Sequence, residues 1–277
     1  MLKNVPVTVI IPCYRCVKTI ERAIRSTLTQ TNRPQEIILI DDFSDDDGKS
    51  LSEIYRLKDL FNDIEISIIS LTKNMGPADA RNAGWNKAKQ PYIAFLDADD
   101  AWHPEKLSIQ YSWMAKHPEV VLTAHNTKIL RSSLIDSKLS KNADFIKANI
   151  LKLLFSNYFP ARSVMLKRDI GYRFLSGKRY TEDYLLWLSI LLDKNSAYYI
   201  NLPLAFSFKN EFGDSGLTAD LHKCHIGEVD TYRHLFESNK ISKIVFIGVV
   251  SFAYAKYLRR HLIVFFKSLI QLIKNAS

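Results

Sequence analysis

The sequence has few cysteines and lacks an export signal. Its 277 residues include only Cys13, Cys16 and Cys224, too few and too unevenly spaced for a disulfide framework. This scarcity favours a reducing compartment. The first residues, MLKNVPVTVIIP, hold a short apolar run without the longer apolar stretch and small-residue cleavage site of a secretory signal. We therefore expect a cytoplasmic protein.

Cys13 and Cys16 form a C-x-x-C motif, a pattern typical of redox sites and of half of a zinc site. A zinc site needs about four ligands. The nearest further Cys/His group, Cys224 with His222 and His225, is far away in the sequence. A redox role would leave the other motifs of the chain without a function. We interpret the pair as two unrelated small residues at a turn between a strand and a helix.

Acidic residues are absent from the C-terminal end of the chain. From residue 239 onwards there are seven Lys and Arg and no Asp or Glu, whereas the rest carries 31 basic and 29 acidic residues. The net charge of +9 therefore comes mainly from this tail. Enzymes that act on nucleic acids are more often basic near the active centre. We therefore expect no nucleic-acid partner.

The uncharged stretch of the basic tail is too short to span a membrane. Residues 244–255 carry no charge, but a spanning helix needs about twenty such residues. Beyond them, polar side chains recur on one helical face: Lys256, Arg260, Lys267, Gln271 and Lys274. A basic amphipathic helix over 239–277 fits the surface of an anionic membrane. The alternative is a helix pair packed on the body, or an oligomer contact.

The first hundred residues alternate between strand-like and helix-like patterns. Apolar runs of strand length occur at 7–11, 36–40, 66–71 and 92–96, and helical periodicity occurs at 17–28, 51–61 and 77–89. This alternation predicts an α/β fold with a mostly parallel, Rossmann-like sheet covered by helices on both faces. Later segments predict a strand at 120–125 and helices at 142–155 and 181–192.

Two of the four predicted strands end in acidic residues, Asp41-Asp42 and the D-x-D pair Asp97 and Asp99. Ligands of such sheets bind beyond the carboxyl ends of the strands. Clustered carboxylates repel one another, so a divalent cation, Mn²⁺ or Mg²⁺, is a natural partner and can hold a diphosphate. Two alternatives stay open. One is a solvated acidic turn, and the other is a phosphatase that uses Asp97 as its nucleophile.

Three further features have both a structural and a functional interpretation. Arg81, on the second turn of its predicted helix, suits two-point contact with a phosphate or ring carbonyl, or is a surface arginine. Glu182 and Asp183 precede an apolar helix, where they either complement the helix dipole or supply a general base. The acidic segment 41–48 has Phe43 where a calcium loop needs its first ligand. We therefore predict that residues 45–47 form a solvated turn or helix cap.

Three segments in this order resemble glycosyltransferase family 2, the inverting group with the GT-A fold. They are "VTVIIPCYRCVKTIERAIRSTLTQTNRPQEIILIDDFSDD", "NMGPADARNAGWNKAKQPYIAFLDADDAWHPEKL" and "RSVMLKRDI…YTEDYLLW". The resemblance covers about residues 5–205 and is most specific over 5–107. It implies a nucleotide-sugar-binding half (1–107) and an acceptor and catalytic-base half (108–210). A mobile active-site segment (211–238) and the basic tail (239–277) would follow.

The resemblance also implies roles for individual residues. For the donor nucleotide, Pro12 and Tyr14 would cradle the base, Asp41 or Asp42 would bind uracil, and Arg81 and Asp97 would lie near the nucleotide. Asp99 with Asp97 would hold the metal, and the residues that approach the donor or acceptor sugar would be Asp100, Trp102 and His103. Asp183, with Glu182 as second choice, would be the catalytic base. One departure is Arg15, where the family usually has Asn.

The expected activity is the transfer of a sugar from a UDP-activated donor to a hydroxyl of a saccharide acceptor. The tail and the family together suggest a polyprenyl-diphosphate-linked acceptor of surface polysaccharide synthesis, at the inner face of the cell membrane. A mobile segment at 208–229, where His222 or His225 is an ordinary surface histidine or a metal or diphosphate contact, would cover the site. Besides the phosphatase, a non-catalytic nucleotide-sugar-binding scaffold at the membrane stays open.

Overall fold

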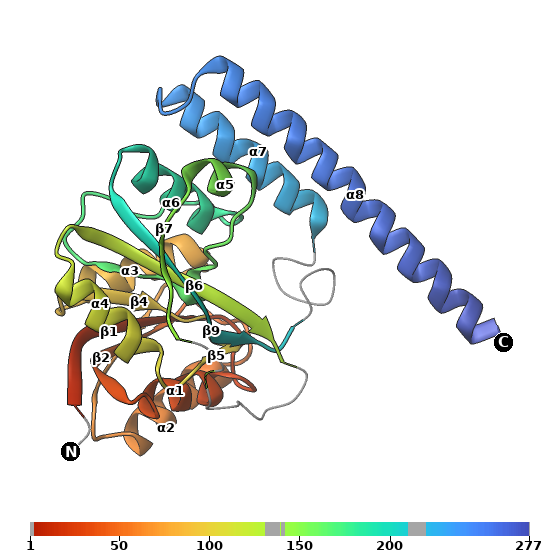
Figure 1. Ribbon diagram of the computed structural model, residues 1–277. Coiled ribbons are helices and arrows are strands. Elements are labelled where there is room, and N and C mark those ends of the chain that lie inside the picture. The colour runs from red at the N-terminus through yellow and green to blue at the C-terminus, as the bar shows by residue number, and fades with distance from the viewer. Residues whose placement is uncertain (1–2, 131–138, 140–141, 210–219, 277) are drawn as a thin grey trace.

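A central sheet with helices on both faces forms the body of the protein, and a long C-terminal helix extends from it (Figure 1). The computed structural model describes residues 3–130, 139, 142–209 and 220–276. The sheet has nine strands in the order β3-β2-β1-β4-β8-β6-β9-β5, and β7 pairs with β9.

The N-terminal part follows the predicted alternation of strands and helices. Its elements are β1 (Lys3–Cys13), α1 (Ile20–Leu28), β2 (Asn32–Asp41), α2 (Lys49–Leu60), β3 (Glu65–Ser70), α3 (Pro77–Lys87) and β4 (Tyr92–Phe95). The strand pairs β1 with β2, β1 with β4 and β2 with β3 are all parallel, as predicted.

The remaining part is less regular. It comprises β5 (Asp100–Trp102), α4 (Lys106–Lys116), β6 (Val120–Ile129), β7 (Phe145–Lys147), α5 (Ile150–Phe155), a short 3₁₀ turn (Ala161–Ser163), β8 (Met165–Lys167), α6 (Glu182–Leu192), β9 (Ser196–Ser207), α7 (Leu221–Glu237) and α8 (Lys243–Ala276). Strand β8 is antiparallel to β4 and β6, and β5 and β7 are antiparallel to β9, so only the first half of the sheet is fully parallel.

The helix predicted over 142–155 is wrong in its first half. Residues Phe145–Lys147 form β7, whose backbone pairs with β9 in the register Phe145 to Ile200. The helix begins only after Asn149, whose side chain accepts a hydrogen bond from the Lys152 amide and caps α5. Strand pairing with a distant segment therefore overrides the local helical pattern.

Alternate residues of the central strands pack into two apolar layers. Ile10, Ile38 and Ile40 face the helices α3 and α6, whereas Val9 and Ile11 face α1 and α4. Burying each such side chain stabilises the fold by about 1.5–3 kcal/mol. A Cβ added to Gly84 of α3 would lie 2.7 Å from the Ile10 side chain, so glycine permits the close approach of this helix to the sheet.

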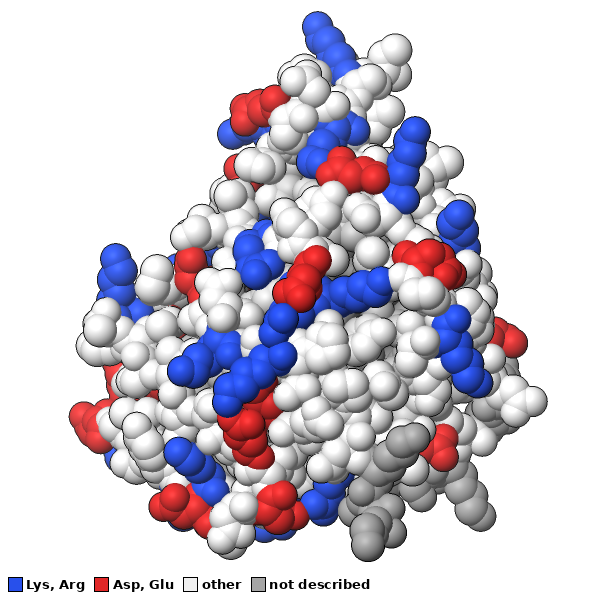
Figure 2. All heavy atoms as spheres, turned by 90° about the vertical axis from the view of Figure 1, so that its left-hand side faces the viewer, with Lys and Arg blue, Asp and Glu red and all other residues white. Residues whose placement is uncertain are grey.

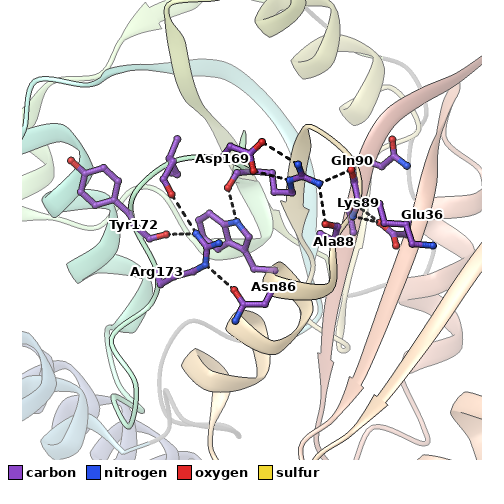
Figure 3. Close-up of polar contacts among 12 residues, drawn as sticks. Glu36, Asn86, Ala88, Lys89, Gln90, Asp169, Tyr172 and Arg173 are labelled. Atoms are coloured by element: carbon purple, nitrogen blue, oxygen red, sulfur yellow. Dashed lines mark hydrogen bonds and ion pairs between the residues drawn. The ribbon is translucent and has the colours of Figure 1, made fainter.

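Polar contacts at the edge of the sheet where its parallel strands begin fix the entry into β4 (Figure 3). Buried Glu36 accepts hydrogen bonds from the Thr8 hydroxyl (2.5 Å) and the Lys89 amide (2.9 Å). Arg168 donates to the Lys89 carbonyl (2.7 Å). On the side of the molecule seen in Figure 2, positive and negative side chains are interspersed. We interpret the contacts of Glu36 and Arg168 as structural support for the sheet, whose parallel strands end at the opposite edge.

The first half of helix α8 belongs to the body. Val249 and Ala253 are buried, and the Phe252 ring meets that of Phe155 at 5.1 Å. The Lys256 ammonium pairs with the Glu228 carboxylate of α7, so this lysine does not belong to a free basic face as predicted. The packing alternative holds for this part of the tail. Within the described ranges, no helix combines the length and apolarity needed to cross a bilayer.

The interpretation of Cys13 and Cys16 as unrelated residues is wrong, because the structure joins them in a disulfide. The bond closes the turn between β1 and α1, in which Arg15 adopts a left-handed backbone (φ 51°). The spacing of three residues allows the two side chains to meet across one turn.

Candidate active site

The parallel strands β1, β2, β3 and β4 end at one edge of the sheet. Cys13 of β1 lies beside Asp41 of β2, which in turn lies beside Ser70 of β3. The chain leaves β1 towards β2 on one side and reaches β4 on the other, so strand order reverses here. This is the place where open α/β sheets bind ligands.

Asp42 organises the loop that follows β3. Its carboxylate accepts hydrogen bonds from the amides of Met75 (2.7 Å) and Gly76 (2.8 Å) and from the Asn74 side chain (3.1 Å). Burial raises the pKa of Asp42, although these donors oppose the shift. Its neighbour Asp41 accepts from the Ser44 hydroxyl (2.6 Å). Both carboxylates therefore fix the loops at this edge of the sheet.

The residues at the end of β1 form an exposed rim beside these carboxylates. Pro12 is half-buried, and Tyr14 is 45% exposed, with its hydroxyl donating to Asp45 (2.7 Å). Arg15 also pairs with Asp45, which holds the pKa of that carboxyl well below its usual range. Residues 45–47 form a turn, as predicted, and Asp46 accepts from the Ser50 amide (3.2 Å), whereas the N-cap of α2 is Gly48.

Arg81 connects the two acidic motifs that lie far apart in the sequence. Its guanidinium bonds to Glu182 (2.5 Å) and to Asp97 (2.7 Å), and the residue is only 5% exposed. It lies on the second turn of α3, as predicted, but it is a buried bridge and not a surface arginine. The interaction brings the end of β4 and the start of α6 together in one site.

The carboxyl groups at the two ends of this bridge have pKa values shifted in opposite directions. Burial raises the pKa of Asp97, but Arg81, Arg162 and Lys209 outweigh it and leave the pKa below its ordinary value. Burial also raises the pKa of Glu182, here to about 7 despite Arg81. A nearby cation lowers the pKa of a buried carboxyl only when its attraction outweighs the desolvation that burial causes.

The start of α6 has an unusual backbone that places both acids in the first turn. Thr181, the residue before the helix, has φ 57°, a left-handed conformation that is costly for a β-branched residue. Its hydroxyl bonds to the Thr231 hydroxyl (2.9 Å) of α7. Strain of this kind persists where the surrounding structure holds it, and here α7 does so.

Asp183 is half-buried and held by one oxygen. Its Oδ1 accepts from the Tyr184 amide (2.7 Å) and from the Asn157 side chain (3.3 Å). Within the described ranges, no group bonds to Oδ2. Burial raises the pKa of Asp183. A carboxylate with one fixed oxygen, one available oxygen and a raised pKa suits a general base.

The D-x-D motif is held by cations. Asp99 pairs with Lys209, and its backbone carbonyl accepts from Arg22. Asp100 is 2% exposed and pairs with Arg162 (3.2 Å), and burial raises its pKa to about 7.

Asp99 suits a hard cation better than its neighbours do. Its carboxylate is partly exposed and carries one lysine, which a metal ion can replace, whereas Asp97 is tied to Arg81. The described residues contain no group of three or more His, Cys, Asp or Glu side chains arranged to hold a metal ion. Mg²⁺ is usually held by one or two carboxylates together with substrate phosphates, so the chemistry of Asp99 fits such an ion.

Trp102 and His103 do not line this site in the described state. Both are 1% exposed, and the Trp102 indole donates to the Arg162 carbonyl (2.8 Å). Lys106 lies over the Trp102 ring, 3.7 Å from its centroid. These side chains support the D-x-D segment from within the core, and their contact with a sugar stays a prediction.

Residues 221–237, predicted to belong to a mobile segment, form helix α7, and residues 210–219 lie outside the described residues. His222 and His225 lie on α7 beside Tyr257 of α8, with ring centroids 6.1 Å and 4.5 Å from it. His222 is exposed, as an ordinary surface histidine would be, whereas His225 is buried.

Sequence reasoning did not assign roles to several polar residues of the site. Asn74, Asn157, Arg162 and Lys209 each bond to one of its carboxylates. Asn157 lies outside any helix or strand, and Arg162 lies in the short 3₁₀ turn, so neither belongs to a periodic sequence pattern. The one available signal was the position of Arg162 at the start of the third family-like segment.

Comparisons with known proteins identify the family and the fold. Residues 8–173 match the family model described as Glycosyl transferase family 2. The chain is 34% identical, over 68% of its length and 71% of the relative's, to the Escherichia coli UDP-Glc:alpha-D-GlcNAc-diphosphoundecaprenol beta-1,3-glucosyltransferase WfgD.

Two solved structures show the same fold. The Staphylococcus aureus TarS fragment in complex with UDP-GlcNAc aligns with a TM-score of 0.66 at 17% identity, covering 92% of this chain and 72% of the other. The mannosyltransferase PcManGT from Pyrobaculum calidifontis, in complex with GDP-Man and Mn²⁺, aligns with a TM-score of 0.59 at 18% identity, covering 91% and 69%. The predicted GT-A fold is therefore confirmed, and the chain belongs to glycosyltransferase family 2.

Proposed function

We propose that this glycosyltransferase moves a sugar from a UDP-activated donor to a hydroxyl of a lipid-linked saccharide, with inversion at the anomeric carbon. The observation that carries the proposal is the Arg81 bridge, because it joins the D-x-D end of β4 to the acids at the start of α6. Donor-binding and proton-accepting groups would then lie at one site. The phosphatase alternative does not fit the family.

The donor nucleotide would lie over the ends of β1 and β2. Tyr14, with its exposed ring, would stack on the base, and Pro12 would border it. The loop 74–76, fixed by Asp42, would close the other side. An imide N–H of uracil would donate to Asp41 or Asp42.

A divalent metal ion, Mn²⁺ or Mg²⁺, would neutralise the diphosphate of the donor and make UDP a better leaving group. Asp99, with Asp97 beside it, would hold the ion after Lys209 moves aside. The PcManGT structure named above contains Mn²⁺ with its nucleotide sugar. Arg81 keeps Asp97 ionised next to this position.

Asp183 would act as the catalytic base. The acceptor hydroxyl would lose its proton to the available oxygen of Asp183 while its oxygen forms a bond to the anomeric carbon. The bond from that carbon to the UDP oxygen would break on the opposite face, so configuration inverts. Glu182 is the less suitable base because it is ion-paired with Arg81 and only 7% exposed.

The acceptor and the site of action are inferred from the relative and from the tail. WfgD is named for an acceptor in which GlcNAc is linked to diphosphoundecaprenol. Exposed apolar side chains of α8, including Leu258 and Leu262, lie beyond the packed half of the helix beside basic Arg259. Peripheral association with the inner membrane surface would bring the enzyme to such an acceptor.

A thermal-shift and calorimetric titration with UDP-sugars, in Mn²⁺ and in EDTA, tests the donor part. We expect UDP-sugar binding that needs the metal and is lost in Asp99→Asn. Transfer to a GlcNAc-diphosphate-lipid, followed by proton NMR of the product, tests inversion. Binding without turnover in the presence of this acceptor would favour a scaffold, and no binding of UDP would contradict the proposal.

A further inference from the structure

A cavity lies beside the start of α6, between the loop 177–180 and the helices α7 and α8. Its volume is about 620 Å³, within the size range of small-molecule sites. It is distinct from the strand ends that would hold the donor. The cavity nevertheless touches the catalytic segment, because Tyr180 is one of its lining residues and precedes Thr181 and Glu182.

The walls of the cavity are basic. Arg179, Lys223 and Arg233 line it and are exposed, while Lys178 is paired with Asp230 (2.6 Å). Lys223 pairs with Asp220 (3.1 Å), whereas Arg233 has no ion-pair partner among the residues that the structure describes. Arginine and lysine together form a favourable site for phosphate oxygens.

Aromatic and imidazole rings form the floor. His225 stacks on Tyr257, with centroids 4.5 Å apart, and meets the edge of Tyr254 at the same distance. His225 is 5% exposed, and neither ring nitrogen has a hydrogen-bond partner in the described part of the chain. Leaving buried polar atoms without partners is costly, so a ligand in the cavity towards which the His225 ring turned would relieve that cost.

The cavity is coupled to both halves of the active site. Arg179 donates to the Asn74 side chain (2.7 Å), which itself donates to Asp42. A Cβ added to Gly227 of α7 would lie 2.6 Å from the Tyr180 Cβ, so α7 contacts the segment before the catalytic acids directly. A ligand held here would contact Tyr180, which precedes the segment that carries Glu182 and Asp183.

Apolar surface continues from the cavity along α8. Ile226, which lines the cavity, is 53% exposed, and Val264 of α8, 42% exposed, lies two turns beyond Tyr257 on the same helical face. A ligand with a phosphate at one end and a hydrocarbon chain at the other would contact both the basic walls and this surface.

We propose that the cavity binds the diphosphate of an isoprenyl-diphosphate-linked acceptor, with the isoprenyl chain along the exposed side chains of α8. This inference rests on the proposed function and assigns the acceptor to a site of its own. Arg179, Lys223 and Arg233 contact the phosphate oxygens, and His225 donates one hydrogen bond to them. Arg179 also transmits acceptor binding to the loop around Asp42.

Titration calorimetry with the full chain tests the proposal, with farnesyl diphosphate, inorganic pyrophosphate and farnesol as probes. We expect farnesyl diphosphate to bind at least tenfold more tightly than either fragment. The double variant Lys223→Gln/Arg233→Gln should weaken its binding about 10–100-fold, in line with charged hydrogen bonds. Lys58→Gln, which removes an exposed charge from α2, should change it less than twofold.

A second variant separates ligand binding from packing. His225→Phe keeps the ring contacts and removes both unpartnered nitrogens, so a merely structural histidine would be replaced with a gain in stability and no loss of binding. We expect the stability to rise and farnesyl diphosphate binding to fall about tenfold.

The results distinguish this inference from the proposed function. UDP-sugar binding with no farnesyl diphosphate binding, or with equal binding by the double variant and by Lys58→Gln, would overturn the acceptor site alone. Equal affinity for pyrophosphate and farnesyl diphosphate would overturn the role of α8. Farnesyl diphosphate binding without any UDP-sugar binding would leave this cavity supported and overturn the proposed function.

Discussion

The two ends of the Arg81 bridge contain the same kind of group in opposite electrostatic states. At the end of β4, Asp97 has a lowered pKa because three cations outweigh its burial. At the start of α6, Glu182 and Asp183 have raised pKa values because burial outweighs the same arginine. The difference teaches that one guanidinium can contact two carboxyl regions with opposite properties. The end of β4 stays anionic, as binding of a cation would require, and the start of α6 has raised pKa values, as proton acceptance would require.

The largest effect should come from the proton-accepting end. Asp183→Asn removes the base and keeps the shape, so kcat for sugar transfer should fall about 10²–10⁴-fold while UDP-sugar affinity stays unchanged. Steady-state kinetics with calorimetry of donor binding measures both. Asp193→Asn, at the other end of α6 and paired with Lys240, is the matched control and should keep normal turnover. Near-normal turnover of Asp183→Asn would contradict the assignment.

Removing the bridge should damage both ends. Arg81→Met leaves buried Glu182 without its cation and removes one of the three cations near Asp97, which should lower the free energy of unfolding by about 3–5 kcal/mol. Urea denaturation measures the loss. Arg56→Met, which breaks an exposed pair with Glu53, should have little effect. Equal stability of the two variants would show that the bridge does not hold the site.

The pH dependence of stability should report the protonated end. The pKa of Glu182 is about 7 in the folded protein and near 4.5 when unfolded, so the folded state binds more protons between these values. Its contribution is complete below about pH 4.5 and is lost as pH rises through 7, a loss of about 1–3 kcal/mol. Urea denaturation from pH 5 to 8 should show this slope in the wild type and a flatter one in Glu182→Gln. Parallel slopes would contradict the raised pKa.

The smallest expected effect concerns the anionic end. Lys209 competes with a metal ion for Asp99, so Lys209→Ala should tighten Mn²⁺ binding two- to fivefold, by an amount typical of partly exposed ion pairs. Lys167→Ala, on β8, is the control. Calorimetry with Mn²⁺ and UDP measures the change, and weaker binding in Lys209→Ala would show that the lysine assists the metal.

The parts of this site that could be predicted from the sequence are those encoded by local patterns. Apolar runs ending in Asp41 and Asp97 identified two strands and the edge at which they end, and the helical pattern placed Arg81 on the second turn of α3. The partners of Arg81 could not be derived in this way, because Glu182 is 101 residues away and is brought near by the packing of α6.

Other features depend on interactions that periodicity does not encode. Strand β7 forms because Phe145–Lys147 pair with β9, against the helical pattern of their segment. The disulfide of Cys13 and Cys16 depends on the left-handed turn at Arg15. The tail was predicted as amphipathic from its charges, yet Lys256 is paired because α8 packs on Glu228 of α7.

The most direct test of the account is a crystal structure of Asp183→Asn with a UDP-sugar and Mn²⁺, with the ion located by its anomalous scattering. The account predicts an ion bound to Asp99 and to the diphosphate, and an anomeric carbon that faces residue 183. An ion or a nucleotide bound away from Asp99, or a sugar turned away from the start of α6, would contradict it.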